Sequence, residues 1–435
     1  MTRRHLAWAV GALLIPFAGT GTALADGTSQ TIGQGNSSSQ SADADATSMQ
    51  LGPSNQNIVV RVLSPGDDGN VTQSNSSDAA ADASNTNTTG QSAVQQAAGG
   101  NAAQEIGQVN GNEQHADADA TSTQIEPSND NIVVRVLSPG DGGDVTQSNS
   151  SQAGAKAGNS NGTTQAAEQV AAPGCGCKGD ALQLIGQANR NKQSANADAT
   201  SKQVKPSNSN IAVRVLSPGN DGHVKQSNSS KATAMSGNTN ATDQKATQQA
   251  GGPAMAERCG CNGGLVLQAI GQLNSNEQQA DADATSTQVA PSNTNIPVRV
   301  LSPGYGGNVD QSNSSTADSQ AGNRNQTGQQ ATQNAGSPKC GCEHADKARL
   351  VIQAIGQENG NHQAADADAT SEQKHASNVN APVSIGGLGH TMPVVADMLA
   401  RLMYPAGSVK QSNDSLAGSL AANANATRQG ASQQA

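Results

Sequence analysis

A motif of the form Gln-x-x-Gly-x-x-Asn-x-x-x-Gln occurs five times along this chain of 435 residues. Its glycines, Gly33, Gly107, Gly186, Gly271 and Gly356, lie 74, 79, 85 and 85 residues apart. A near-constant period indicates stacked units, in which neighbours bury what a single unit cannot. An enzyme needs one irregular pocket, whereas this chain presents the same surface five times. The repeat therefore favours a structural or binding role, and an enzyme is the least expected class.

The repeat divides the chain into a leader and five units. Residues 1–25 have the pattern of a secretory signal peptide, with Arg3 and Arg4, an apolar stretch, and small residues before the expected cleavage site. That apolar stretch and all later ones are too short to span a membrane. We therefore expect a secreted protein, extracellular or on the cell surface, without membrane insertion. The units are expected at residues 26–100, 101–174, 175–258, 259–339 and 340–435.

The composition excludes a conventional globular core. The chain has one Trp, one Phe and two Tyr residues, and small and amide side chains dominate it. Large cores depend on aromatic and branched aliphatic side chains. Two kinds of chain tolerate this composition: a disordered polymer, and a narrow β-stack with small side chains inside and amide ladders between its rungs. A net charge of -10 without a basic stripe excludes nucleic acid as an expected partner.

The second unit shows how the chain alternates. Polar and small residues alternate over 104–121, a pattern typical of a strand. The alanines between 116 and 120 should face one way, and Asp117 and Asp119 the other. Residues 132–137, Ile-Val-Val-Arg-Val-Leu, form the most strand-like run, and a Gly-rich loop follows. The second half of the unit echoes the first, so each unit is predicted to contain two related half-units and hence several rungs.

The fifth unit departs from the others by an insertion. Residues 391–403 begin with an N-cap residue, Thr391, and a proline, and Val395, Met398, Leu399 and Leu402 fall at helical spacing. We expect a short helix near 391–404 that caps the stack, with a docking helix for an anchor or partner as the alternative. The fold class is thus all-β, a repetitive β-solenoid-like stack of five units with a short C-terminal capping helix. The alternative is a largely disordered low-complexity chain.

The recurring Gln, Gly and Asn resemble curlin repeats, the subunits of bacterial amyloid fibres. The resemblance covers about a dozen residues of each unit, and here the first spacing is Gln-x-x-Gly and the unit is several times longer than a curlin repeat. The resemblance implies a β-solenoid whose Gln and Asn side chains stack in ladders and template fibre growth. The implied ladder positions are Gln30, Asn36, Gln40, Gln104, Asn110, Gln114, Gln183, Asn189, Gln193, Gln268, Asn274, Gln278, Gln353, Asn359 and Gln363.

Six cysteines form three Cys-Gly-Cys pairs, each in a link before the third, fourth or fifth unit. In an exported chain they are expected to form disulfides between links or between molecules. A soft-metal site and a redox-active dithiol remain alternatives. A bridge within one pair would be a strained ring, so pairing across links is favoured. The disulfide candidates are Cys175, Cys177, Cys259, Cys261, Cys340 and Cys342.

Paired aspartates recur after the motif in four units. Asp117, Asp119, Asp281 and Asp283 are weak calcium candidates, because stacked carboxylates offer oxygen ligands. The favoured interpretation is a solvated face that discourages lateral aggregation, and no metal or cofactor is expected. Arg61, Arg135, Arg214 and Arg299 recur in the β-branched strand and are expected to pair with that acidic face, each exposed pair contributing under about 1 kcal/mol.

These observations favour a secreted structural repeat protein of an extracellular fibre, coat or matrix, held together by Gln/Asn ladders and by self-association. Other matrix or surface components are possible partners. The alternative is a cell-surface adhesin or a calcium- or polysaccharide-binding repeat module. Thr47, Thr121, Thr200, Thr285 and Thr370 recur once per unit, a spacing too sparse for an ice lattice if each unit holds several rungs. No serine or histidine recurs in a catalytic arrangement, so no catalytic residue is expected.

Overall fold

The computed structural model describes residues 27–98, 101–172, 180–250, 264–336, 350–385 and 407–434. Every regular element within these ranges is a β-strand. The prediction of an all-β, repetitive, solenoid-like stack is therefore confirmed. The helix predicted near 391–404 lies outside the described residues.

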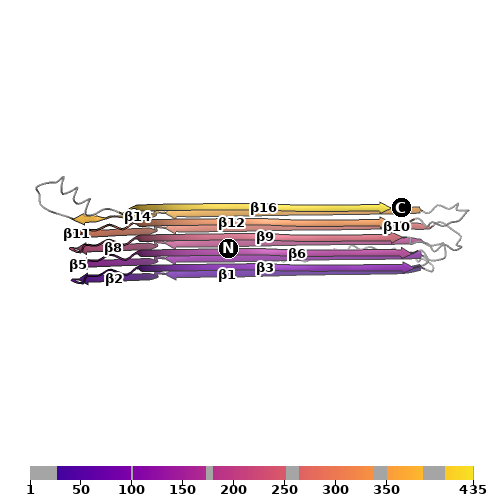
Figure 1. The fold of residues 1–435 in the computed structure, drawn as a ribbon. Coiled ribbons are helices and arrows are strands. Elements are labelled where there is room, and N and C mark those ends of the chain that lie inside the picture. The colour runs from indigo at the N-terminus through magenta and orange to yellow at the C-terminus, as the bar shows by residue number, and fades with distance from the viewer. Residues whose placement is uncertain are drawn as a thin grey trace.

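The strands of the five units form three parallel sheets (Figure 1). Sheet A contains β1 (Gly27–Leu51), β4 (Asn101–Ile125), β7 (Ala181–Val204), β10 (Leu265–Val289) and β13 (Leu350–Lys374). Sheet B contains β2 (Ser54–Val62), β5 (Ser128–Val136), β8 (Ser207–Val215), β11 (Ser292–Val300), β14 (Ser377–Asn380) and β15 (Val383–Ile385). Sheet C contains β3 (Val71–Ala98), β6 (Val145–Ala172), β9 (Val224–Ala250), β12 (Val309–Asn334) and β16 (Val409–Gln434).

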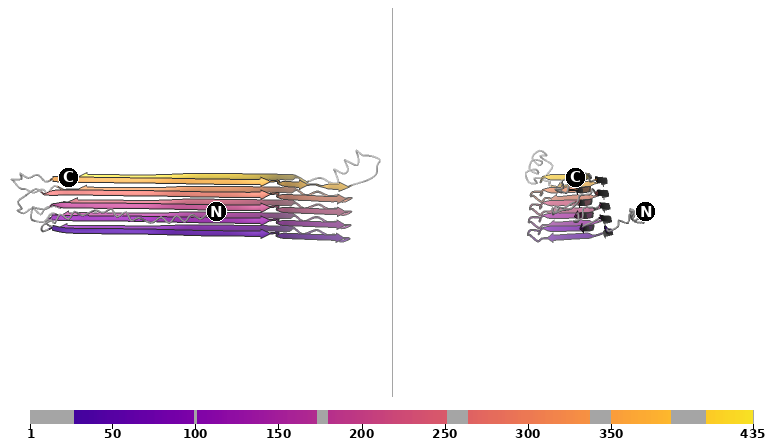
Figure 2. Two further views of the ribbon diagram at one scale, coloured as in Figure 1. Left: turned by 180° about the vertical axis from the view of Figure 1, so that it is seen from behind. Right: turned by 90° about the vertical axis from the view of Figure 1, so that its right-hand side faces the viewer.

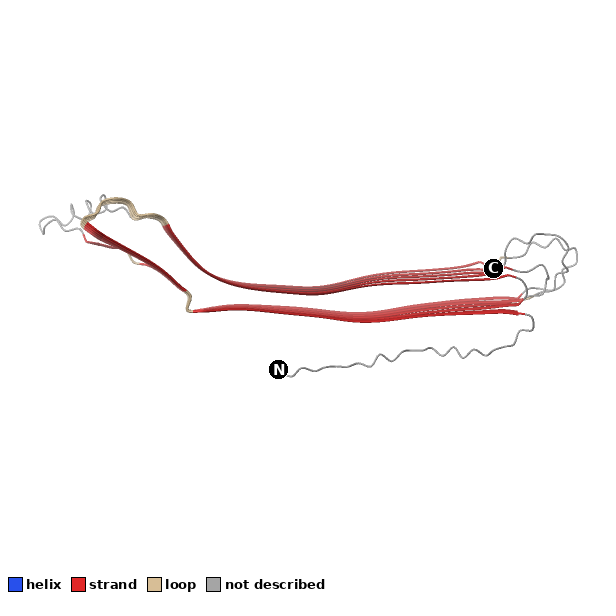
Figure 3. Ribbon diagram, turned by 90° about the horizontal axis from the view of Figure 1, so that it is seen from below, coloured by secondary structure: helices blue, strands red, loops and turns tan. Residues whose placement is uncertain are grey.

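Each unit forms a single rung, so the prediction of several rungs per unit is wrong. The chain runs out along sheet A, turns into the short strand of sheet B, and returns along sheet C (Figure 3). The two half-units seen in the sequence are the two long strands of one rung, which lie face to face. The two strands resemble each other in sequence because both line the same narrow interior. Seen end-on, the stack of five rungs is narrow compared with its length (Figure 2).

Neighbouring units are stacked in register. Gln30 pairs with Gln104, and Gln104 with Gln183, so the same position of each unit recurs at the strand spacing of about 4.8 Å. The period-2 alternation of the sequence becomes an inside–outside alternation. Ala116 and Ala118 are fully buried in the interior between sheets A and C. Asp117 and Asp119 lie on the outer face. An alanine-lined interior allows the two sheets to approach closely, which explains a core without aromatic side chains.

Two bends in each rung require backbone that L-residues rarely adopt. Gly52 has φ of 60°, but the same bend holds Glu126 at 54° and Lys205 at 50° in the next rungs. The bend after sheet B holds Leu63 at 53° and Leu137 at 50°. Non-glycine residues in this region are disfavoured, by about 1 kcal/mol or more each. Stacking must offset this strain, because every rung repeats the same bend.

Within the described ranges, the structure contains no helix of the length and apolar character needed to cross a membrane.

Candidate functional site: side-chain rows and open end rungs

The amide side chains of the motif form continuous hydrogen-bonded rows along the stack. In the first row, Gln104 Nε2 donates to Gln30 Oε1 at 3.3 Å, and Gln183 Nε2 donates to Gln104 Oε1 at 2.8 Å. Gln268 and Gln353 continue this row at 2.7 and 2.8 Å. The sequence placed these residues in a ladder, and the structure brings them together in one. The Asn36 and Gln40 rows are built in the same way, through Asn110, Asn189, Asn274 and Asn359, and through Gln114, Gln193, Gln278 and Gln363.

The rows have opposite directions for the two residue types. Each Gln donates to the Gln of the preceding rung, as Gln114 Nε2 does to Gln40 Oε1 at 2.8 Å. Each Asn donates to the Asn of the following rung, as Asn110 Nδ2 does to Asn189 Oδ1 at 2.7 Å. A second acceptor fixes many of these amides, for example Thr163 Oγ1 at 3.0 Å from Asn110 Nδ2. The stack therefore has a chemical polarity from its first rung to its last.

Sequence reasoning missed many further rows. The recurrence of one residue type at the same place in each unit was the available signal. Sheet B contains two Asn rows, and sheet C contains rows that begin at Gln73, Asn75, Asn85, Asn87, Gln91 and Gln95. Buried serine hydroxyls also form a chain that crosses between sheets A and C. Ser122 Oγ lies 2.8 Å from Ser151 Oγ, and Ser201 Oγ donates to Ser151 Oγ at 3.1 Å. Stacked polar networks of this kind are strong only when every member is satisfied.

The recurring arginines do not pair with the acidic outer face, so that prediction is wrong. Arg135 Nη2 lies 2.7 Å from Asp68 Oδ2, in the loop after sheet B, and Arg61 Nε binds the other carboxylate oxygen at 2.9 Å. The side chains of Arg135 and Arg214 are 0% and 3% exposed. The arginine lies on the inner face of its strand, while the valines on either side point outward. Burial lowers the pKa of Arg214, and the nearby Asp221 opposes that shift.

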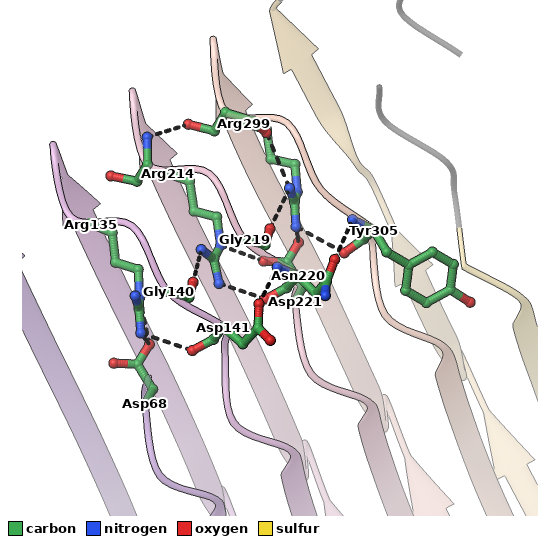
Figure 4. Close-up of polar contacts among 12 residues, drawn as sticks. Asp68, Arg135, Gly140, Asp141, Arg214, Gly219, Asn220, Asp221, Arg299 and Tyr305 are labelled. Atoms are coloured by element: carbon green, nitrogen blue, oxygen red, sulfur yellow. Dashed lines mark hydrogen bonds and ion pairs between the residues drawn. The ribbon is translucent and has the colours of Figure 1, made fainter. Parts of the chain in front are cut away.

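One carboxylate serves the arginines of two rungs in this corner. Asp221 binds Arg214 at 2.7 Å and Arg299 at 2.8 Å (Figure 4). Asp68 binds Arg61 and Arg135 in the same way. The second and fourth rungs have Gly142 and Gly306 at this loop position. Each buried guanidinium also donates to a loop carbonyl of the preceding rung, as Arg214 Nη1 does to Gly140 O at 2.8 Å. The alternation of Asp and Gly gives each arginine pair one shared anion and avoids carboxylates on adjacent rungs.

A cavity of about 400 Å³ runs along the stack between sheets B and C, next to the arginines. One wall is the Asn57 row, whose amides bind one another between rungs at 2.6 and 2.7 Å. The other walls are the Val59 row, the Val71 row and loop glycines such as Gly143. The cavity is thus lined by the Asn57 row, by apolar side chains, and by charged groups of the corner such as Arg214 and Asp221.

The aspartates on the outer face of sheet A form two rows of like charge. Asp45, Asp119, Asp198, Asp283 and Asp368 occupy successive rungs in register. Burial, followed by the neighbouring carboxylates, raises the pKa of Asp198 to about 6. Its Oδ1 atom has no hydrogen-bond partner within the described part of the chain.

The calcium candidates Asp117, Asp119, Asp281 and Asp283 all lie in these two rows. In the described ranges no three acidic, His or Cys side chains are arranged to hold a metal ion. In the row that contains Asp117, the third rung has Asn196 in place of an aspartate. Its Nδ2 donates to Asp117 Oδ1 at 3.1 Å. All six cysteine candidates lie outside the described residues.

The first and last rungs leave one edge open in sheets A and C. Among the described strands, β1 pairs only with β4, and β13 only with β10. The amide rows also end there with unused groups. Gln30 Oε1 accepts from Gln104, whereas its Nε2 binds only Gln96 O, at 3.0 Å, without the row partner that every later Gln has. At the other end, Gln353 Nε2 donates to Gln268, and its Oε1 accepts from no described residue.

The chain matches no protein-family model, and comparisons with curated proteins and with solved structures found no match. The proposed function therefore rests on the geometry of the chain itself.

Proposed function

We propose that this chain is a secreted structural protein whose copies stack head to tail into a fibre, coat or matrix. The observation that supports this proposal is the complementarity of the two open ends. The first rung ends its Gln rows with unused donors, and the fifth rung ends them with unused acceptors. The Asn rows end in the opposite sense: among the described residues, Asn36 Oδ1 has no donor, and the Asn359 amide binds Thr427 but has no row acceptor.

Strand lengths and register also fit head-to-tail contact. β13 and β1 each have 25 residues, and Gln353 and Asn359 occupy in β13 the places of Gln30 and Asn36 in β1. A copy placed below the first rung would continue each ladder with the direction it has inside the chain. A contact between two first rungs would instead place Gln donors against donors and Asn acceptors against acceptors, which leaves polar groups unpaired. The polarity of the rows therefore selects one mode of addition.

Two further features of the sequence agree with this proposal. The resemblance to curlin repeats implies fibre growth on stacked Gln and Asn ladders, and the expected signal peptide implies assembly outside the cell. The three cysteine-containing links follow β6, β9 and β12, whose final residues lie on adjacent rungs in register. We propose that disulfides between these links lock the stack after export.

A binding surface is the second candidate, because one observation favours it. Since each unit is a single rung, Thr47, Thr121, Thr200, Thr285 and Thr370 are direct neighbours at about 4.8 Å. The sparse spacing inferred from several rungs per unit no longer applies. A regular hydroxyl row beside the acidic rows would suit an extended polysaccharide. Binding of a polysaccharide by the unassembled chain, in a sedimentation assay, would support this candidate.

The head-to-tail contact is tested by the double variant Gln30→Glu/Gln40→Glu in the mature chain. A glutamate at either position still accepts from Gln104 or Gln114, so the internal rows are kept. The amide donors are lost, together with their bonds to Gln96 O and Thr86 O within the first rung, and acceptors would meet acceptors across the contact. Each such clash costs about 1–3 kcal/mol, so the critical concentration for sedimentable fibres should rise at least about tenfold.

The matched control is Ser37→Glu/Ser41→Glu, which adds the same charge on the exposed face of the same strand. It should assemble like the unmodified chain. Equal assembly of the Gln30/Gln40 variant, or an unmodified chain that remains monomeric, would contradict the proposal. Circular dichroism of the unassembled variant checks that the β-stack is retained.

A further inference from the structure

The outer surface of sheet B is aliphatic from its third outward position through the bend that follows, after two polar outward positions that hold Ser128 and Asp130 in β5. Four rows cross it, and we call them together the aliphatic face. In rung 1 they begin with Ile58, Val60, Val62 and Leu63, which are 62%, 63%, 57% and 71% exposed. The later rungs continue these rows in register with Ile132, Val134, Val136, Leu137, Ile211, Val213, Val215, Leu216, Ile296, Val298, Val300 and Leu301.

The aliphatic face does not serve the interior of its own chain. The inward positions of sheet B hold the Asn rows and the arginines, as Asn129, Asn131 and Arg135 show in β5. In β5 the Asn and Arg side chains are buried, whereas Ile132, Val134 and Val136 lie half-buried on the outer face. Contiguous exposed apolar surface of this kind marks an interaction site in soluble proteins. No charged side chain points outward within these four rows, because the arginine between the valines points inward.

Backbone strain supports a role for this surface. Leu137, Leu216 and Leu301 each have φ of 50° and remain 45–46% exposed. Glycine would relieve the strain at these bends, and an exposed leucine gains little packing within its own chain. A side chain retained under strain in every complete copy of the loop points to a contact outside the chain.

The fifth rung keeps this surface while its interior changes. Val383 and Ile385 pair with Val298 and Val300 and are 44% and 56% exposed, so they extend two of the rows. The residue between them is Ser384, at the place of the inward arginine. The outer pattern therefore persists where the inner arginine row ends.

We propose that the aliphatic face is where two stacks of this chain pair side by side. This inference rests on the proposed head-to-tail fibre. Flat rows that repeat at one spacing are complementary to a second copy with the same spacing, and two such faces can interdigitate as a dry interface. The outer face of sheet A carries rows of like charge, such as the Asp45 row, and the outer face of sheet C carries hydrated charges of both signs, such as Lys156 and Asp82. A second copy is thus the partner whose surface fits this face and whose other surfaces do not compete.

The size of the face predicts that pairing depends on stacking. Its width of about 17 Å and height of about 19 Å, from strand rise and spacing, give roughly 300 Å² per chain. A stable interface buries about 800 Å² per partner. Single chains should therefore not pair, whereas stacks of about three or more copies reach the required area. Lateral pairing should then add to fibre stability as each further copy joins.

The test is the double variant Val134→Thr/Val213→Thr, assembled into fibres and examined by electron microscopy with mass-per-length measurement. Threonine keeps the β-branched shape and the strand preference of valine, so stacking should be unchanged. The unmodified chain should give two chains per five rungs, or per about 24 Å of fibre. The variant should give one chain in the same length, which halves the mass per length.

The matched control is Val94→Thr/Val109→Thr, which changes two exposed valines outside the aliphatic face. Threonine already occupies the Val94 row at Thr247 and Thr332. This control should keep the paired mass per length. Unpaired fibres from the unmodified chain, or paired fibres from the Val134/Val213 variant, would overturn the lateral proposal while leaving head-to-tail stacking intact. Binding of the unstacked chain to lipid vesicles through this face would also overturn it. Absence of any fibre would instead contradict the proposed function.

Discussion

Each rung has a body, formed by sheets A and C, and a corner, formed by sheet B and the loop after it. The two regions place polar and apolar side chains in opposite ways. In the body, sheets A and C enclose alanine and neutral amides, and sheet A carries rows of aspartates on the outside. In the corner, sheet B and its loop enclose arginine–aspartate pairs and expose aliphatic side chains. The body gains cohesion from ladders that any further rung can extend. The corner uses fixed ion pairs and close loop contacts, which specify one register.

The largest expected effect on stability comes from substitution of a glycine, and it should differ between the corner and the body. A Cβ at Gly219 would lie 2.1 Å from Gly140 O of the preceding loop, and its φ is +141°. A Cβ at the motif glycine Gly107 would meet nothing within 4 Å. Gly219→Ala should therefore lower the free energy of unfolding by about 3 kcal/mol or more. Gly107→Ala should change it by less than about 0.5 kcal/mol. Urea unfolding of both variants makes the comparison, and equal effects would contradict it.

The next effect tests whether the shared carboxylate holds the corner. Asp221→Asn removes the anion between the buried Arg214 and Arg299 and should cost about 2–3 kcal/mol of unfolding free energy. The carboxylate of Asp141, in the preceding loop, accepts one exposed backbone bond, from Asn220 N at 2.8 Å. Asp141→Asn should therefore cost less than about 1 kcal/mol. If the two variants lose equal stability, the Asp–Gly alternation has no electrostatic role.

The body should respond to pH in the opposite sense from a salt-bridged protein. The folded-state pKa of Asp198 is about 6, above its usual value of 3.8, because burial and neighbouring carboxylates disfavour the charged form. Asp198 therefore lowers stability when ionised, fully above about pH 6. This cost disappears as the pH falls through 6 towards 3.8, where the folded state binds the proton more tightly.

Asp198→Asn should thus raise the unfolding free energy at pH 7.5 by about 1 kcal/mol, after allowance for solvent screening. It should also flatten the dependence of stability on pH between 4 and 6. Chemical unfolding at pH 4.5 and pH 7.5 measures both quantities. Asp243→Asn, at an exposed position of sheet C, serves as the control. A lower unfolding free energy of the unmodified chain at pH 4.5 than at pH 7.5 would contradict this prediction.

The smallest effect concerns the strained bend at the edge of the corner. Leu216→Gly places a residue without a Cβ at φ of 50° and should raise the unfolding free energy of the monomer by about 0.5–1 kcal/mol. The same change removes a side chain from the aliphatic face and should weaken lateral pairing of fibres. Stability and mass per length should therefore move in opposite directions. A decrease in both would show that Leu216 serves the interior of its own chain.

The sequence predicted the structure correctly where its repeat pattern is compatible with only one arrangement. Alternating alanines and aspartates predicted strands with a narrow interior, and repeated Gln30 and Asn36 positions predicted the rows that the structure contains. The rung count was wrong because two half-units that echo each other fit either two rungs or two faces of one rung. Nothing in the pattern distinguishes these, since both place similar residues on an inner face.

The corner was the least predictable region. The run Val134-Arg135-Val136 has the alternation of a strand, and hydrophobicity argues for the valines inside. The structure has the reverse, because Gly66 O and Asp68 of the preceding rung, together with Asp141 O of its own loop, satisfy Arg135. Partners that come from another unit, 67 to 69 residues away, leave no local signal. The shared role of Asp68 and Asp221 becomes visible only when the rungs are in register.

In the proposed fibre, the fifth rung of one copy continues into the first rung of the next. Cryo-electron microscopy of assembled fibres tests it most directly, because the fifth rung lacks the corner arginine and marks each chain. A rung without the corner arginine should appear once per five rungs, at a rise of about 24 Å per copy, and always on the same side of the contact. Fibres in which fifth rungs meet each other, or whose rise is not that of five rungs, would contradict it.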